Sequence, residues 1–312
     1  MYLGGNEINN CMTNKYKIVM IVLGLISFSF SSIAQTDDLE KLLNAGNTPQ
    51  KQYIHNAFKS SRVINGHSME MLGKGVLDFR ILHRFGTLSS GYHELFGLDQ
   101  ASMRFGFDYG VTKNLSLGFG RSTFNKELDG FVKYRIIPQS KGPGSFPISI
   151  VWVSGITMKT AKETDQFRAK MENRIGYYHQ LILGRKFGTA FTLQLSPAFV
   201  HRNLVEYNSD NNNMVALGIG GRIKLSNRSA LILDTYPILY GGRNGYNQIP
   251  LSIGFDIETG GHVFQLHITN TRGMNEKAFI SETTENWGKG QIRIGFNLSR
   301  VFTIVKNKEG SW

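Results

Sequence analysis

Two carboxylates and a histidine stand close together in the sequence, and this grouping is the first candidate for chemistry. Asp256 and Glu258 precede a Gly260-Gly261 pair, and His267 follows it. Carboxylates and imidazoles serve both as metal ligands and as general acid–base groups. The spacing, however, places Asp256 and Glu258 on one face of a strand and His267 on the polar face of the next. We interpret them as hydrogen-bonded or ion-paired neighbours near a tight turn, and we predict no metal site.

A lipid hydrolase is the other enzymatic candidate, because some membrane barrels place a nucleophile beside a histidine at the lipid boundary. His83 is suited to this position, since it follows the apolar face of Leu77, Phe79 and Ile81. No serine stands at a helpful spacing from it. The single cysteine, Cys11, lies ahead of an apolar segment that is expected to be removed, so thiolate chemistry is not expected. We predict a protein without catalytic residues or cofactors.

The elements that must position these side chains are strands with a period of two. From Ser102 to Val111, apolar residues alternate with small or polar ones at every position. The same alternation recurs at 215–224, 251–258 and 292–299. About twelve such runs can be counted, each of about ten residues, which is the length that a tilted strand needs to cross an outer membrane.

Short and long links alternate between these runs, which is typical of an up-and-down barrel. Residues 138–146 are an exception, because they should form a short turn but run to nine residues. The expected short turns are 112–114, 186–189, 226–228 and 259–261, and the expected long links are 85–99, 158–173, 202–213, 241–248 and 271–289.

A soluble β-sandwich would show the same alternation, because its strands also have one apolar and one polar face. Long strands and polar faces rich in Gly and Ser favour the membrane. Lipid offers no partner to backbone N–H groups, so a sheet that crosses it must close on itself. The sequence therefore predicts an all-β fold, a closed up-and-down antiparallel transmembrane β-barrel of about 12 strands with a short helical N-terminal segment. Interfacial aromatic residues are predicted at Phe124, Tyr134, Trp152, Tyr236 and Tyr240.

Charged side chains recur on the polar faces and would point into the lumen of such a barrel. Opposed charges there either form a network that closes the pore or line a narrow channel that sorts solutes by charge. Both alternatives stay open, with interior ion pairs slightly favoured. The predicted lumen-lining residues are Asp78, Arg80, Arg104, Asp108, Arg222, Lys224, Asp256, Glu258, His267 and Arg293.

The N-terminus has the layout of an export signal. Lys15 and Lys17 precede an apolar run from Ile18 to Phe30, and a small residue, Ala34, ends the region. Met1 and Met12 are both candidate starts. We predict a cleavable signal peptide at 1–34, a periplasmic helical or extended segment at 35–74, an outer-membrane barrel at 75–304 and a tail at 305–312, in a Gram-negative-type envelope.

The segment before the barrel allows two interpretations. Short helices are expected near 37–46 and from Thr48-Pro49 to Phe58. Residues 61–74 could then enter the lumen as a plug or only lead the chain to the wall, and the second alternative is favoured. The formal net charge of +12 is spread along the chain without a Lys/Arg block, so nucleic acid is not an expected partner.

Several stretches resemble a family of exported outer-membrane β-barrel proteins of unknown function. The resemblance covers roughly residues 55–304. It implies a barrel and an outer-membrane address, and no activity. The stretches are Arg62-Val-Ile-Asn-Gly-His-Ser-Met-Glu, Gly73-Lys-Gly-Val-Leu, Gly97-Leu-Asp-Gln-Ala, Asp129-Gly-Phe-Val-Lys-Tyr, and the block from Asp256 through Phe279-Ile-Ser-Glu-Thr-Thr and Trp287-Gly-Lys-Gly to Arg300-Val-Phe.

These observations lead to three functional hypotheses. The first is a non-enzymatic pore or carrier for small solutes or lipidic molecules. The alternative is a closed structural or interaction barrel that binds a partner through its extracellular loops 158–173 and 271–289. An outer-membrane lipid hydrolase ranks third. Membrane lipid is an expected contact in each case, and the sequence leaves the oligomeric state open.

Overall fold

The computed structural model describes residues 50–207, 210–243 and 246–305. The chain divides into two units, residues 1–50 and 51–312, and the described helices and strands all belong to the second. The expected signal peptide, the first expected helix and most of the C-terminal tail lie outside the described residues.

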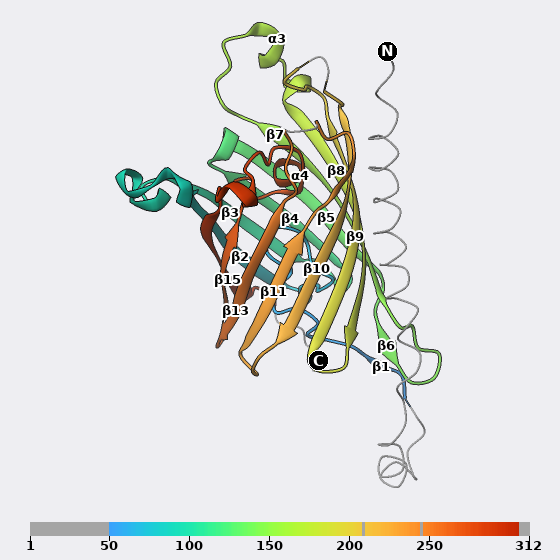
Figure 1. The fold of residues 1–312 in the computed structure, drawn as a ribbon. Helices are drawn as coiled ribbons and strands as arrows, with labels where there is room; N and C mark the ends of the chain where they lie inside the picture. Colours follow the sequence, from blue (N-terminus) through green and yellow to red (C-terminus); the bar gives the residue numbers. More distant parts are fainter. Residues whose placement is uncertain (1–49, 208–209, 244–245, 306–312) are drawn as a thin grey trace, which may run out of the picture. The chain divides into compact units, whose positions relative to one another are not determined.

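Twelve antiparallel wall strands close into a barrel (Figure 1). Neighbours in sequence pair with one another, and the ring closes where β15 pairs with β2. The short strand β12 continues β11 beyond Pro237 and pairs with the same neighbour, β10, so the two form one wall strand. The wall strands are β2 (Val76–Thr87), β3 (Ala101–Gly110), β4 (Leu115–Ser122), β5 (Glu127–Ile137), β7 (Ser149–Lys159), β8 (Ile175–Phe187), β9 (Phe191–Arg202), β10 (Asn213–Lys224), β11 (Ser229–Thr235) with β12 (Ile238–Tyr240), β13 (Leu251–Thr259), β14 (His262–Thr269) and β15 (Arg293–Thr303).

Alternation along each strand turns the polar face inward and the apolar face outward. On β3, Phe105 and Phe107 are 40% and 48% exposed, whereas Arg104 and Asp108 are at most 1% exposed. This is the reverse of a soluble sandwich, and it is the arrangement that a surrounding lipid phase stabilises. The predicted fold class is confirmed.

The two ends of the barrel differ in the length of their links. Both ends of the barrel domain, before β2 and after β15, lie at the end with the short turns, which we call the terminus end. The opposite end, the loop end, carries all of the expected long links. The terminus end has turns at 111–114, 188–190, 225–228 and 260–261, and the loop end has links at 88–100, 123–126, 160–174, 203–212, 241–250 and 270–292.

The one long link at the terminus end has a structural reason. Residues 138–148 contain β6 (Ser140–Lys141), which pairs with β1 (Gln52–Tyr53) ahead of the barrel. Ile54 also donates its backbone N–H to the carbonyl of Gln139 at 2.9 Å. The extra residues therefore fix the point at which the N-terminal chain reaches the barrel.

In the described residues, short helices lie only in the links. The loop end carries α3 (Gln166–Ala169), α4 (Glu276–Ser281) and the 3-10 turns η2 (Leu88–Ser90), η3 (Tyr92–Gly97), η4 (Phe124–Lys126), η5 (Met171–Arg174) and η6 (Trp287–Lys289). Within the described parts of the chain, none of the helices has the length and apolar character needed to cross a membrane.

Two expectations about local structure are wrong. No helix spans the described residues from 50 to 58, because β1 pairs there with β6 and Asn56 adopts a positive φ of 56°. Tyr236 is not interfacial, since it is 1% exposed and its hydroxyl accepts a hydrogen bond from Gln180 inside the barrel at 2.9 Å. Pro237 interrupts the wall strand directly after Tyr236, so the alternation does not carry through this point.

Candidate functional site

Buried charged side chains line the inner surface of the wall. Among the described strand residues, six cations and six carboxylates are at most 7% exposed, so the wall presents no excess charge to the lumen. The cations are Arg80, Arg84, Arg104, Lys133, Arg222 and Arg293, and the carboxylates are those of Asp78, Asp108, Glu127, Asp129, Asp234 and Asp256.

Eight of the ten predicted lumen-lining residues lie in this interior, and Lys224 and Glu258 are half-buried at its terminus end. The sequence analysis missed Arg84, although the residue lies an even number of positions after Asp78 and Arg80. The alternation along the strand therefore places it on the same inward face. Lys133 was missed because Phe131, an apolar residue on the same inward face, interrupts the polar pattern of that face. The eight are Asp78, Arg80, Arg104, Asp108, Arg222, Asp256, His267 and Arg293, and the others missed are Glu127, Asp129 and Asp234.

The chain ahead of β2 lies inside the barrel. We call residues 57–71 the N-terminal insert, and all of its residues from 57 to 69 except Lys59 are buried. The insert turns back at Asn65-Gly66, where Val63 donates its backbone N–H to the carbonyl of Gly66 at 2.9 Å. The sequence analysis favoured a segment that only leads to the wall, and the structure shows the plug instead. Residues near this turn carry the first stretch of the family resemblance.

Hydrogen bonds attach the N-terminal insert to the wall. The Asp234 carboxylate accepts the backbone N–H groups of Asn65 and Gly66 at 2.7 and 3.0 Å. Gln194 accepts from the N–H of Met69 and donates to the carbonyl of His67. Other wall side chains that contact the insert include Arg80 with Ser60 and Ser61, Arg84 with Asn65, Lys133 with Ser61 and Glu70, Thr192 with Ala57, Ser252 with Asn65, Gln265 with Val63, and Asn297 with Ile64.

The turn of the insert fits the wall closely at Gly66. A Cβ atom at this position would lie 1.7 Å from the Tyr236 hydroxyl oxygen. We expect Gly66→Ala to displace the insert and to lower the free energy of unfolding in detergent by about 1–3 kcal/mol, the usual cost of overpacking. Gly221→Ala is the matched control, since nothing lies within 4 Å of its added Cβ. Equal urea midpoints for the two variants would contradict this position of the turn.

A second segment enters the lumen from the loop end. We call residues 271–283 the loop insert, and the whole of α4 within it is buried. Asn275 caps the helix by accepting the N–H of Ala278 at 2.8 Å, and its amide donates to Glu127 on the wall. Lys277 forms an ion pair with Glu127 at 2.6 Å. Residues 271–283 of the loop 271–289 therefore occupy the lumen and are not free to bind an extracellular partner.

Glu282 also holds the loop insert to the wall, because it pairs with Lys159 of β7 at 3.1 Å as well as with Lys277 within the insert at 2.8 Å. Burial opposes ionisation of Glu282, but the charges of Lys277 and Lys159 outweigh it and lower the pKa of this carboxyl to about 2 from an ordinary 4.5. A lowered pKa gives stability that is complete above the ordinary value and is lost as the pH falls toward the folded one. The loop insert is thus not released by mild acid at this contact.

The two inserts meet at a buried ion pair near the middle of the lumen. Arg62 of the N-terminal insert contacts Glu276 of the loop insert at 2.9 Å, and both side chains are at most 1% exposed. His67 lies 3.4 Å from the same carboxylate. The Arg62 guanidinium also lies over the ring of Phe131, 5.6 Å from its centroid. Each insert therefore holds the other in place.

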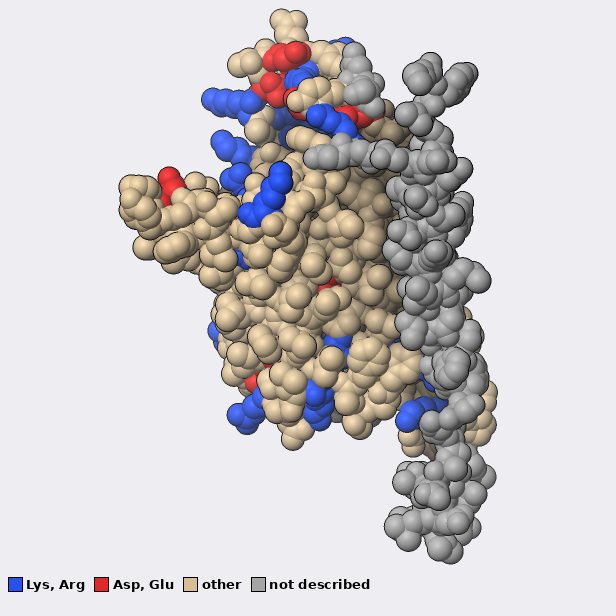
Figure 2. Space-filling model, in the orientation of Figure 1, with Lys and Arg blue, Asp and Glu red and all other residues tan. Residues whose placement is uncertain are grey.

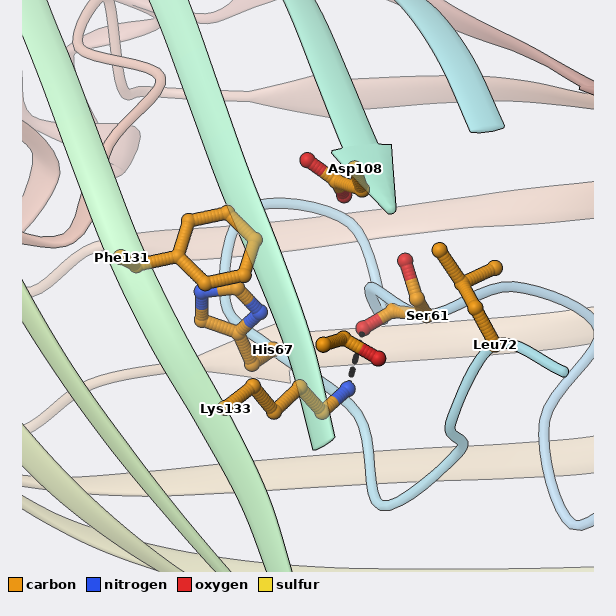
Figure 3. Close-up of a pocket in the computed structure, with 7 residues that line it drawn as sticks. Ser61, His67, Leu72, Asp108, Phe131 and Lys133 are labelled. Carbon is orange, nitrogen blue, oxygen red and sulfur yellow. Dashed lines mark hydrogen bonds between the residues drawn. The ribbon is translucent and has the colours of Figure 1, made fainter. Parts of the chain in front are cut away.

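A second cluster lies beside this junction (Figure 3). Figure 3 shows His67 against the Phe131 ring, with Lys133 donating to the carbonyl of Ser61 at 3.1 Å. The Asp108 carboxylate lies 3.9 Å from Arg80. The space among these side chains does not admit a water molecule. A larger cavity of about 200 Å³ opens at the terminus end, and Phe58, Ser60 and Leu72 bound it.

The structure does not gather the carboxylates and the histidine near Gly260-Gly261 into one cluster. Asp256 accepts a hydrogen bond from Gln265 at 2.9 Å, across β13 and β14. In the described part of the chain, no three His, Cys, Asp or Glu side chains are grouped so that they could hold a metal ion.

His83, the histidine considered for lipid hydrolysis, packs among aromatic side chains on the outer face. Its ring stacks on Phe296 with centroids 4.8 Å apart and meets Phe85 edge-on at 4.4 Å. Within the described residues, its Nδ1 atom has no hydrogen-bond partner. Among the described residues, the side-chain contacts of His83 are therefore with aromatic rings, and no hydrogen bond joins it to a nucleophile.

A serine and a histidine do meet elsewhere on the outer face. Ser154 on β7 and His179 on β8 are direct cross-strand partners, with 2.9 Å between Oγ and Nδ1. The backbone N–H groups around them are used in the unbroken β7–β8 pairing, so they are not free to stabilise an oxyanion. Among the described residues, no carboxylate or amide orients the other ring nitrogen of His179. Ser154 and His179 therefore supply each other's hydrogen bond in an apolar surrounding. Within the described residues, the other parts of a hydrolase site are missing.

Comparison with known proteins gives one family. The family described as "Membrane bound beta barrel domain (DUF5777)" matches residues 58–302, which include the loop insert, all of the N-terminal insert but Ala57 and all of the wall strands but Thr303. No curated protein sequence matches the chain.

Solved structures of membrane barrels are similar at low identity. A NanC porin is 9% identical, with 72% of this chain and 98% of that chain covered and a TM-score of 0.45. An outer membrane channel from Pseudomonas putida F1 is 15% identical, with 75% and 98% covered and a TM-score of 0.45. The Ralstonia pickettii toluene transporter TbuX is 8% identical, with 77% and 96% covered and a TM-score of 0.33. The similarity concerns only the barrel fold that the strand pairing establishes.

Proposed function

The chain belongs to the family of membrane-bound β-barrel domains, and on this premise we propose that it is a non-enzymatic outer-membrane conduit closed by a two-part plug. The observation that carries the proposal is the position of the N-terminal insert, which fills the lumen without being part of the wall. Every wall strand has both of its neighbours without the insert. Removal of the insert would therefore leave the sheet intact and clear the part of the lumen that the insert occupies.

The size of the barrel supports a conduit over a purely structural barrel. Eight strands make a barrel that wall side chains can fill, whereas wider barrels enclose cavities, channels or plugs. Here the wall has twelve strands, and two separate segments occupy the interior. A barrel with no passage to control would not need this additional width.

The lining favours small hydrophilic solutes over lipidic ones. The inward faces carry charged and amide side chains, and the buried cations and carboxylates of the wall are equal in number. An open lumen would therefore be wetted, and its interior would discriminate weakly between anions and cations. We place the terminus end in the periplasm, in keeping with the export signal expected at 1–34.

Single-channel recording on a barrel with a disulfide lock tests this proposal. Asn65 and Ser252 contact one another at 2.8 Å, so Asn65→Cys with Ser252→Cys should join the insert to the wall. In mild urea the reduced protein should show openings, and the oxidised protein should stay closed. Ser252→Cys alone is the control and should open under both conditions. Equal currents before and after reduction of the lock, or a wild-type barrel that never opens, would contradict a removable plug.

The proposal also predicts that the Ser154 and His179 pair has no hydrolytic role. Ser154→Ala should leave the protein's ester hydrolysis at the background rate, because the site lacks oxyanion donors and an orienting group. A fluorophosphonate probe, which labels activated serines, should not react with the folded barrel. Labelling that disappears in Ser154→Ala and is retained in Ser196→Ala, a serine inside the lumen, would overturn the non-enzymatic assignment.

A further inference from the structure

The fold gathers the excess positive charge at one end of the barrel. When buried side chains are left out, the segments at the loop end, 86–102, 120–128, 157–176, 201–214, 240–251 and 270–293, contain eleven basic and nine acidic residues in the described chain. By the same criterion the described residues at the terminus end include eleven basic residues and only Glu70 and Glu258 as acids. In Figure 2 blue and red lie side by side above, whereas blue predominates along the lower rim. The basic residues of the terminus end are Lys51, Lys59, Lys74, Lys113, Arg135, Lys141, Arg185, Lys186, Lys224, Arg228 and Arg300.

Five of these cations form a set that we call the basic ring: Lys113, Lys141, Arg185, Arg228 and Arg300. Four of the five are exposed and Arg185 is half-buried. Within the described residues, none of the five has an ion pair with a carboxylate, although Lys59 at the same end pairs with Glu258. The positive charge of the ring is therefore not neutralised by the protein.

The basic ring runs around the barrel and does not form a patch on one side. Lys113 lies in the β3–β4 turn, Lys141 in the β5–β7 link, Arg185 at the end of β8, Arg228 in the β10–β11 turn and Arg300 near the end of β15. The β13–β14 turn is the one hairpin at this end that lacks such a cation, and it carries Glu258 instead. A single protein docked on the barrel would meet only part of this set, whereas lipid headgroups surround all of it.

Two cations of the basic ring have surroundings typical of the boundary between lipid tails and headgroups. Arg185 lies over the ring of Phe187 and Arg300 over Phe302, each 5.0 Å from the centroid. Arginine and aromatic side chains at strand ends are typical of this boundary, where the stem contacts apolar groups and the charge reaches the headgroups. Basic clusters at a membrane surface attract anionic lipids.

We infer that the basic ring binds the headgroups of anionic phospholipids in the leaflet that faces the terminus end. The guanidinium and ammonium groups would donate hydrogen bonds to lipid phosphates, and the distribution around the barrel would select an annulus of anionic lipid. The interaction would weaken as salt screens the charges.

Native mass spectrometry of the barrel, released from detergent that contains equal amounts of phosphatidylglycerol and phosphatidylcholine, tests this inference. The wild-type protein should retain phosphatidylglycerol several-fold more than phosphatidylcholine. A ring variant, Lys113→Gln, Lys141→Gln, Arg185→Gln, Arg228→Gln and Arg300→Gln, should bind the two lipids about equally. A slower mobility after heating on a gel confirms that each variant is folded.

A control variant removes the same number of charges at the loop end: Lys126→Gln, Lys162→Gln, Arg168→Gln, Lys170→Gln and Lys289→Gln. It should keep the wild-type preference. If the ring variant does not fold, the test uses the wild-type protein alone. Its preference for phosphatidylglycerol must then fall when the lipids are loaded at high salt. Equal retention of both lipids by the wild-type barrel would overturn the inference and leave the ring to an acidic soluble partner. Equal losses in the ring and control variants would overturn it as well.

Discussion

Deletion of the N-terminal insert should turn a silent barrel into a conducting one. Residues 57–71 run into the lumen from the terminus end as far as Ser252 near the loop end of β13, and the wall strands pair with one another without them. Joining residue 56 to residue 72 leaves inward polar groups such as Asp234 and Gln194 exposed to water, which can replace the lost hydrogen bonds. The chain would then line a wetted passage, and planar-bilayer recording should show a steady ion current that the intact protein does not give.

The loop insert still occupies part of the lumen in this deletion variant. Removal of residues 272–283 as well should therefore increase the current further, while their removal alone should have a smaller effect. Deletion of residues 161–173 is the matched control, because that loop is largely exposed and lies outside the lumen. A folded, heat-modifiable barrel that lacks both inserts and carries no current would contradict the conduit, whereas current in the loop control would point to a leak at the loop end.

The wall could be predicted from the sequence because a period of two is a local property. The residues on either side of Arg104 or Phe105 indicate which face of the strand each one occupies. Closure of the sheet follows from the lack of hydrogen-bond partners in lipid. The number of strands and the alternation of short and long links followed from the same signal. The length of the link at 138–148 could not be predicted from this signal, because it depends on the pairing of β6 with β1, which lie far apart in the sequence.

The contents of the lumen could not be predicted in the same way. The N-terminal insert has no periodic pattern, and its attachment depends on wall residues distant in sequence, such as Asp234 and Asn297. Arg62 and Glu276 are 214 positions apart, and nothing near either residue indicates the other. The family resemblance at Arg62–Glu70 marked the segment as noteworthy, but a resemblance to proteins of unknown function could not state what the segment does.

Breaking the ion pair between the two inserts should strongly destabilise the folded barrel. Glu276→Gln leaves the Arg62 guanidinium buried beside a neutral partner, and Arg62→Met leaves the Glu276 carboxylate without its ion pair. Removal of one member of a buried ion pair typically costs about 3–5 kcal/mol, because the remaining charge stays desolvated. Urea unfolding in detergent, followed by tryptophan fluorescence, should show losses of this size for both variants.

The double variant, Arg62→Met with Glu276→Gln, separates the role of the ion pair from that of the individual side chains. With both charges removed, no unpaired charge stays in the lumen, so the double variant should be more stable than either single variant. The inserts would nevertheless have lost their mutual contact, and the double variant should open more often than the wild-type protein in mild urea. Additive losses would instead mean that Arg62 and Glu276 act independently, since Arg62 also contacts Phe131 and the carbonyl of Asn65. A stable double variant with raised conductance would identify the ion pair as the contact that keeps the two halves of the plug together, at a place where stability alone does not require a charge.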